Sequence, residues 1–189
     1  MTKKFRVYLI LIVLAFIAIN LCGCFDIYAE YRYPTAKEAV EANGKYTVKN
    51  VYGAEELNGV ICYLFDHVGD GSYKSIVLNK NENGYCAYDK FGDYYIKLIS
   101  FDEGVVHYIV SYKKFGNYVL EIRLLDYEQL PTVTDTIGNS GLIITISESS
   151  AMAYLVLDKA PADYKICVDG IWYPIPLSEY EHFNEIPPQ

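Results

Sequence analysis

The feature of this sequence that most limits its fold is a series of β-prone runs separated by short turn clusters. Between residues 45 and 125, runs rich in Val, Ile and Tyr alternate with these clusters at short, nearly regular intervals. The clusters are Asp70-Gly71, Asn81-Glu82-Asn83-Gly84, Phe91-Gly92-Asp93, Asp102-Glu103-Gly104 and Phe115-Gly116-Asn117. Intervals and turns of this length are typical of consecutive antiparallel hairpins, so we expect a meander of about six or seven strands.

Three of these runs alternate clearly enough to assign faces to them. The apolar positions are Tyr94, Ile96 and Leu98; Val106, Tyr108, Val110 and Tyr112; and Tyr118, Leu120, Ile122 and Leu124. The largely polar positions between them are Lys97, His107, Ser111, Lys113, Glu121 and Arg123. This alternation predicts a sheet with one buried and one solvent-exposed face. A short helix over 35–42, started by a capping box of Thr35 and Glu38, is the candidate to cover the buried face.

The apolar pattern lapses over residues 126–141, where Pro131 and Gly138 indicate a linker or long loop. A β-rich piece, 142–189, follows, and its strongest hairpin signal is Asp169-Gly170 between alternating apolar runs. We expect this piece to pack on residues 34–125 as a sandwich-like lobe, with a separate small domain as the alternative. The predicted fold class is therefore mainly β: an antiparallel meander with one short N-terminal helix, plus a C-terminal β-rich, sandwich-like lobe.

The N-terminus has the three-part layout of a secretory signal. Lys3, Lys4 and Arg6 form a basic head, residues 7–19 are apolar, and Asn20 interrupts the apolar run. Leu21, Cys22, Gly23 and Cys24 follow directly. This segment resembles the signal and lipidation box of bacterial lipoproteins, and the texture of the whole chain loosely resembles small surface lipoproteins of Gram-positive bacteria.

The resemblance implies a role for each residue of the box. Leu21 is the aliphatic position, Gly23 is the small residue before cleavage, and Cys24 is diacylated on its sulfur and becomes the mature N-terminus. Cys22 departs from the usual Ala, Ser or Thr, but acylation of Cys22 itself would place the bulky Leu21 at the cleavage position. The implied organisation is a signal peptide over 1–23 and a tether over 24–33.

Two other readings of this segment are an uncleaved membrane anchor and a plain secreted protein. A membrane-spanning helix needs roughly 20 apolar residues, and the apolar run over 7–19 is short for that purpose.

The charge of the chain limits its partners. The chain has 16 basic and 24 acidic residues, and removal of residues 1–23 leaves 13 basic ones, which gives a net charge of about −11. Nucleic acid and anionic lipid headgroups repel such a surface. We therefore expect no nucleic-acid partner, and attachment to the membrane through N-terminal acyl chains instead of through charge.

Three cysteines belong to the expected domain, namely Cys62, Cys86 and Cys167. Their spacing does not match a zinc site, and an odd number cannot all pair internally. We expect small buried residues that fill gaps in the core, with one disulfide as the alternative in an oxidising compartment.

Other motifs of catalytic or metal-binding appearance fail on spacing or context. The segment 66–71 begins like a calcium loop, but Val68 and Val77 occupy positions that need ligands. Ser111 and Lys114 match a Ser-x-x-Lys spelling at the end of a strand, where that motif needs a helix. The three histidines have no ligand partner nearby in sequence, so we predict no catalytic residues, metal site or cofactor.

Tyrosine is unusually common, with 20 residues against eight phenylalanines. The face assignment places Tyr94, Tyr108, Tyr112 and Tyr118 on the expected buried face. In contrast, Tyr88, Tyr95 and Trp172 fall on the opposite alternation or beside a turn. These three residues form our candidate contact patch, because each ring combines apolar area with a polar tip.

The sequence therefore predicts a lipid-anchored protein on the outer side of the cell membrane that acts as a non-catalytic binding module for an envelope protein or a wall polymer. The alternative is an envelope hydrolase whose site is assembled only in the fold.

Overall fold

The structure is a computed structural model that describes residues 31–42, 44–69, 71–87, 94–100, 106–159 and 161–175, with backbone alone for 94–100 and 106–108. The fold is mainly β, with antiparallel sheets and one short helix near the N-terminus, as the sequence predicts. The expected signal peptide, the lipidation box and most of the tether lie outside the described residues. The sheets described below belong to a compact unit that begins at Arg32.

The N-terminal sheet has the strand order β1-β2-β3-β4, and each neighbouring pair is antiparallel. Its strands are β1 (Val48–Leu57), β2 (Val60–His67), β3 (Tyr73–Asn81) and β4 (Gly84–Cys86). The short β4 pairs with residues 79–81 at the end of β3. Tyr33 forms an antiparallel bridge with Tyr85, which attaches the segment before α2 to β4.

The central sheet has the strand order β5-β6-β7-β10-β9. Its strands are β5 (Tyr94–Ser100), β6 (Val106–Lys114), β7 (Asn117–Leu125), β9 (Leu142–Ser147) and β10 (Ser150–Leu157). β10 pairs with β7 along its whole length. Residues 142–157 of the expected C-terminal lobe therefore complete the sheet that the earlier strands begin.

The C-terminal sheet has the order β12-β11-β8 and comprises β8 (Val133–Asp135), β11 (Lys165–Val168) and β12 (Ile171–Pro174). The predicted hairpin at Asp169-Gly170 is confirmed, because β11 pairs with β12 and both turn residues have positive φ, 46° and 84°. The segment 126–141 is more ordered than a loop, since it contains β8. The short strand escaped prediction because only Val133 in it is a strongly β-prone apolar residue.

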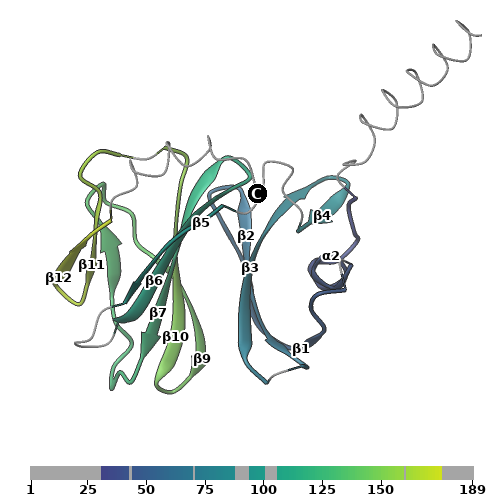
Figure 1. The fold of residues 1–189 in the computed structure, drawn as a ribbon, viewed down its shortest axis with the longest axis horizontal. Helices are drawn as coiled ribbons and strands as arrows, with labels where there is room; N and C mark the ends of the chain where they lie inside the picture. Colours follow the sequence, from purple (N-terminus) through teal and green to yellow (C-terminus); the bar gives the residue numbers. More distant parts are fainter. Residues whose placement is uncertain are drawn as a thin grey trace, which may run out of the picture. The chain divides into compact units, whose positions relative to one another are not determined.

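Three clusters of buried side chains define the layers, which Figure 1 shows in order from β12 to helix α2 (Ala36–Glu41). One cluster lies between the C-terminal and central sheets, a second between the central and N-terminal sheets, and a third between the N-terminal sheet and α2. The central sheet is thus covered on both faces.

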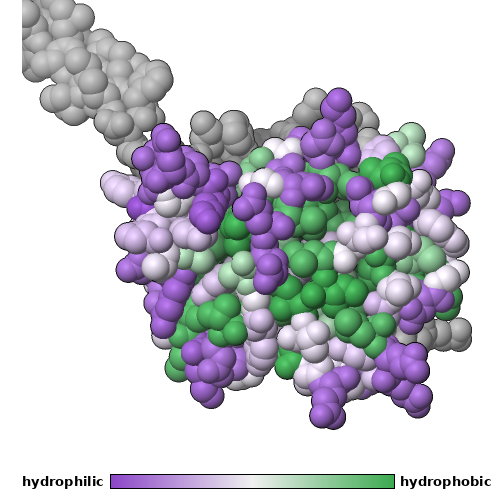
Figure 2. Space-filling model, turned by 180° about the vertical axis from the view of Figure 1, so that it is seen from behind, coloured by the Kyte–Doolittle hydropathy of each residue, from purple (hydrophilic) through white to green (hydrophobic). Residues whose placement is uncertain are grey.

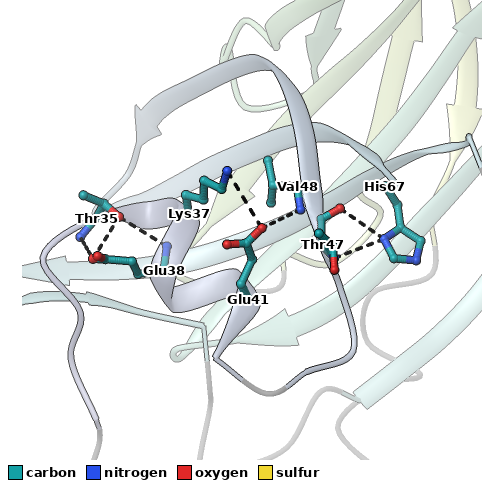
Figure 3. A network of polar contacts seen from close by, with 7 residues as sticks. All are labelled: Thr35, Lys37, Glu38, Glu41, Thr47, Val48 and His67. Atoms are coloured by element: carbon teal, nitrogen blue, oxygen red, sulfur yellow. Dashed lines mark hydrogen bonds and ion pairs between the residues drawn. The ribbon is translucent and has the colours of Figure 1, made fainter. Parts of the chain in front are cut away.

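The predicted capping box of α2 is confirmed, and Figure 3 shows it together with neighbouring polar contacts. The Glu38 amide donates to Thr35 Oγ1 over 3.2 Å, and the Thr35 amide donates to Glu38 Oε2 over 3.1 Å. Near the other end of the helix, Glu41 Oε1 accepts the Val48 amide at 2.7 Å. The helix is therefore held at one end by its own cap and at the other by β1.

The location of α2 corrects one expectation. Val40 packs with Ile61, Phe65 and Leu78 of the N-terminal sheet, so α2 does not cover the sheet formed by residues 94–125. The face that we expected α2 to cover is instead covered by other strands, because the chain splits its hairpins between two sheets after β4.

The pairing of β6 with β7 corrects a second expectation, that of one buried and one exposed face. Ile109 lies opposite Ile122, and Val110 lies opposite Glu121, and directly opposed residues project from the same face. Val110 and Tyr112 therefore share a face with Glu121, away from Leu120 and Ile122. Ser111, which the alternation placed in solvent, is 1% exposed.

Candidate binding cavity

A cavity of about 370 Å³ lies between the N-terminal and central sheets. Small-molecule sites typically start near 300 Å³, so its size is sufficient for a small ligand. It is lined by Lys45, Tyr46, Ser75, Ile76, Val77, Ala87, Val110, Tyr112, Lys114 and Glu121. The lining thus combines aliphatic side chains with charged and hydroxyl groups in similar measure.

The two sheets pack closely on the side away from this cavity. On that side, β1 and β9 approach at Gly53, where a Cβ atom would come within 2.7 Å of Ile144 Cγ2. The cavity lies at β3, β6 and β7, on the opposite side of both strand orders. The two sheets therefore approach closely at β1 and β9 and leave space between them at β3, β6 and β7.

A hydrogen-bond network fixes the carboxylate of the cavity. Ser75 Oγ donates to Glu121 Oε1 over 2.7 Å, and Tyr112 Oη donates to the same oxygen over 2.8 Å. Tyr154 Oη lies 2.8 Å from Ser75 Oγ. Because the single hydroxyl hydrogen of Ser75 is given to Glu121, Tyr154 is the donor in this third bond. The directions of these three hydrogen bonds are therefore determined.

The environment keeps these hydroxyl groups protonated. Burial raises the pKa of Tyr112 and Tyr154 well above the ordinary value of 10.0, and the negative charge of Glu121 adds to the rise. Burial, followed by the Glu121 charge, also raises the pKa of the Cys62 thiol to about 12. Both tyrosines therefore act as donors at neutral pH, and Cys62 is not a nucleophile there.

Positive charge lies on the same lining. Lys114 comes from the end of β6 and is 4% exposed, whereas Lys45 precedes β1 and is exposed, with its Nζ 5.1 Å from the centre of the Tyr46 ring. Next to the network, the Arg123 guanidinium lies 4.5 Å from the centre of the Tyr73 ring, and burial lowers the pKa of Arg123. The interface thus contains fixed charges of both signs.

The sequence analysis missed this site because it assigned Glu121 to a solvent-exposed face. One signal in the sequence argues against this assignment. Residues 151–157 of β10 are all apolar, at odd and even positions alike, and the structure buries all of them. A strand buried on both faces must belong to a sheet with no exposed face at that point. Polar residues on the neighbouring strand β7 then face another layer of protein instead of solvent.

The candidate contact patch is spread over different parts of the fold. Trp172 lies on the edge strand β12 of the C-terminal sheet and is 51% exposed. Tyr95 lies on the edge strand β5 of the central sheet, and Tyr88 lies outside the described residues. Tyr95 and Trp172 therefore belong to separate sheets.

Figure 2 shows one face of the molecule, on which apolar residues gather in the middle and polar residues surround them.

The weak motifs have structural roles. The Asp66 carboxylate accepts hydrogen bonds from Asn50 Nδ2 and Tyr52 Oη, which lower its pKa and tie β1 to β2. Ser111 and Lys114 are three positions apart on one strand, so they project from opposite faces. The Thr47 amide donates to His67 Nδ1 over 3.2 Å, a contact that Figure 3 includes.

The described cysteines, Cys62, Cys86 and Cys167, are free thiols, and the first two are buried. Within the described part of the chain, no group of three His, Cys, Asp or Glu side chains has the arrangement of a metal site. No described helix is long and apolar enough to cross a membrane.

No protein-family model, curated protein or solved structure matches this chain. The geometry of the site is therefore the basis for any assignment of function to the folded part.

Proposed function

We propose that this chain is a membrane-tethered, extracytoplasmic lipoprotein that acts as a non-catalytic binding module of the cell envelope. The observation that carries the binding role is the cavity between the N-terminal and central sheets, in which hydrogen bonds already orient Glu121. A polar group that is fixed before the ligand arrives lowers the entropic cost of binding. The partner is an envelope component that presents a small polar group to this cavity.

The anchor rests on the resemblance of residues 21–24 to a lipidation box. In this proposal, acyl chains on Cys24 hold the protein in the membrane. The chain between Cys24 and Tyr33, which is paired with Tyr85, can span at most roughly 3.3–3.6 Å per residue. This short tether keeps the binding body close to the bilayer surface.

The anchor is tested by metabolic labelling with a fatty acid, followed by fractionation and intact-mass analysis. The wild-type chain is expected in the membrane fraction with an acylated Cys24 at its N-terminus, and Cys24→Ala is expected to lose the label. A labelled Cys22→Ala variant serves as the control, because Cys22 is only the residue two before the acylated position. A mature chain that keeps Met1, or one that is unlabelled and free in the cytosol, would refute this part of the proposal.

A second candidate, an envelope hydrolase, is favoured by one observation. Ser75 gives its hydroxyl hydrogen to Glu121, which is the contact between a nucleophile and a base. However, Tyr112 donates to the same carboxylate oxygen, so Glu121 Oε1 already accepts a second hydrogen bond. The serine is also held by Tyr154. This arrangement favours a fixed binding surface over an activated nucleophile.

The binding role is tested by crosslinking in intact cells followed by pull-down, with the wild type compared with Ser75→Ala. A partner that the wild type captures and that Ser75→Ala loses supports binding. Turnover of an ester or amide substrate that Ser75→Ala abolishes would favour the hydrolase instead.

A further inference from the structure

We infer that the cavity between the N-terminal and central sheets binds a neutral sugar unit that carries an N-acetyl group. This inference rests on the proposed binding function and names the class of its ligand. Its basis has two parts. The charged groups of the lining already interact within the protein, and the lining places a hydrogen-bond acceptor and aliphatic surface in one small cavity.

The carboxylate of the lining is held by the protein before any ligand arrives. Glu121 Oε1 accepts the hydroxyl hydrogens of Ser75 and Tyr112. A ligand cation would compete with these donors for the carboxylate and would also lose its own hydration on entry. A neutral hydroxyl group loses less solvation free energy, and it can donate to a carboxylate that keeps its protein donors.

The two ammonium groups of the lining also have partners within the protein. Lys45 Nζ lies 5.1 Å from the centre of the Tyr46 ring, and these contacts between a cation and a ring are stabilising. Lys114 Nζ lies 5.6 Å from the centre of the Phe115 ring. A ligand anion would be attracted to Lys114 but would lose its hydration, and in a poorly solvated place these two changes largely offset each other. The lining therefore favours a neutral ligand.

The surface of the cavity selects among neutral ligands. An alkyl chain would cover the Glu121 carboxylate with CH₂ groups and give it no new hydrogen bond, which costs free energy. A molecule with hydroxyl groups alone would gain nothing from the aliphatic side chains. A pyranose sugar has hydroxyl donors at the rim of its ring and CH groups on its faces, so it matches both kinds of surface. The aliphatic part of the lining consists of Ile76, Val77, Ala87 and Val110.

The pairing of β6 with β7 favours a sugar with an N-acetyl group. Val110 lies directly opposite Glu121, so the two side chains are neighbours on the same face of the central sheet. An acetamido group beside a ring hydroxyl has the matching arrangement, because it places a methyl group close to hydrogen-bond donors. The methyl group gains from burial against Val110 while a donor reaches Glu121. The cavity volume of about 370 Å³ is sufficient for a monosaccharide unit.

The inference is tested by ligand-observed NMR titration of the full-length protein, extracted in a detergent without a sugar headgroup. Four monosaccharides are compared at a pH of about 6, where D-glucosamine carries an ammonium group and D-glucuronate a carboxylate. The other two, N-acetyl-D-glucosamine and D-glucose, are neutral, and D-glucose lacks the acetamido group.

N-Acetyl-D-glucosamine should bind at least about fivefold more tightly than each of the other three sugars. D-Glucose loses the methyl contact, and the two charged sugars lose the hydration of their charge on entry. Equal or tighter binding of a charged sugar, equal binding of D-glucose, or no binding of N-acetyl-D-glucosamine would overturn the inference.

Variants assign the sugar to this cavity. Glu121→Gln keeps an acceptor but loses the charge that strengthens the hydrogen bond, so it should weaken N-acetyl-D-glucosamine binding about tenfold. Val110→Phe fills part of the cavity and should abolish binding, whereas Val110→Ala leaves it open and should retain most of the affinity. Glu56→Gln, on the exposed part of β1, is the matched control and should behave as the wild type. Thermal melting shows whether each variant is folded, and unchanged affinity in both Glu121→Gln and Val110→Phe would overturn the assignment.

The design separates failure of the ligand assignment from failure of the binding function. If the sugars do not bind or all bind equally, but crosslinking in intact cells captures an envelope partner that Glu121→Gln loses, the ligand class is wrong and the binding function stands. If the sugars fail and no captured partner depends on Glu121, both are wrong. Selective binding of N-acetyl-D-glucosamine that Glu121→Gln weakens supports both.

Discussion

The two faces of the central sheet differ in what they pack against and in what they contain. Toward the C-terminal sheet, Leu120, Ile122 and Leu124 form an apolar interface with residues such as Ile166, all fully buried. Toward the N-terminal sheet, the interface contains Glu121 and the cavity. Adjacent residues of β7 thus have different roles. The face toward the C-terminal sheet contributes to stability, whereas the face toward the N-terminal sheet keeps a buried charge, whose desolvation costs free energy.

The largest expected effect comes from truncating the apolar interface. Leu120→Ala should lower the free energy of unfolding by about 3 kcal/mol, because it removes a fully buried side chain and leaves a cavity. Urea denaturation measures this change. Leu130→Ala, at a side chain that is half exposed, is the control and should change stability by less than about 0.5 kcal/mol. A loss below about 1 kcal/mol for Leu120→Ala would mean that this interface is not a packed core.

The next effect concerns Asp135, a buried carboxylate on the apolar side. Asp135 accepts hydrogen bonds from the amides of Ile137 and Asn139, from Asn139 Nδ2 and from Tyr164 Oη. Asp135→Ala should cost about 2 kcal/mol, because the buried Tyr164 hydroxyl and the turn amides lose their acceptor. Tyr164→Phe removes one of these donors and should cost only about 1 kcal/mol. Equal losses, measured by thermal melting, would contradict a role of Asp135 in the turn.

The polar side should show coupling between its members. Ser75→Ala leaves the Tyr154 hydroxyl without its acceptor and should cost about 1–2 kcal/mol. Tyr154→Phe removes the hydroxyl itself, so the double variant should be more stable than the sum of the two single changes predicts. A double-mutant cycle in urea measures this coupling, and strict additivity would contradict the hydrogen bond.

The smallest effect is a dependence of stability on alkaline pH. The folded pKa values of Tyr112 and Tyr154 lie above the ordinary 10.0, so the folded state keeps protons that the unfolded state releases. Their stabilising contribution is complete below pH 10 and is lost as the pH rises from there toward the folded values. The slope of unfolding free energy against pH above 10 should be smaller in Tyr112→Phe than in the wild type. Equal slopes would refute the burial of this hydroxyl.

Local signals in the sequence predict much of the fold. The Asp169-Gly170 turn and the Thr35 capping box depend on neighbouring residues, so both are readable from a short window. The mainly β fold class follows in the same way from alternation and turns.

The cavity depends on pairings that no short window contains. Glu121 meets Tyr112 because β6 and β7 pair in one particular register with an irregularity between Val106 and Tyr108, and it meets Ser75 across two sheets. Alternation along a strand shows which residues share a face of that strand. It does not show which faces of neighbouring strands lie on the same side of the sheet. The local clue that the central sheet is covered on both faces is β10, in which residues 151–157 are all apolar.

The most direct test of this account compares Leu120→Ala with Glu121→Gln, two neighbours on β7, by measuring for both the unfolding free energy and the capture of an envelope partner by crosslinking. The account predicts that Leu120→Ala loses about 3 kcal/mol of stability and still captures the partner, whereas Glu121→Gln keeps its stability and loses the partner. If Glu121→Gln captures the partner as the wild type does, or if both variants lose only stability, the division of the central sheet into a structural face and a binding face is contradicted.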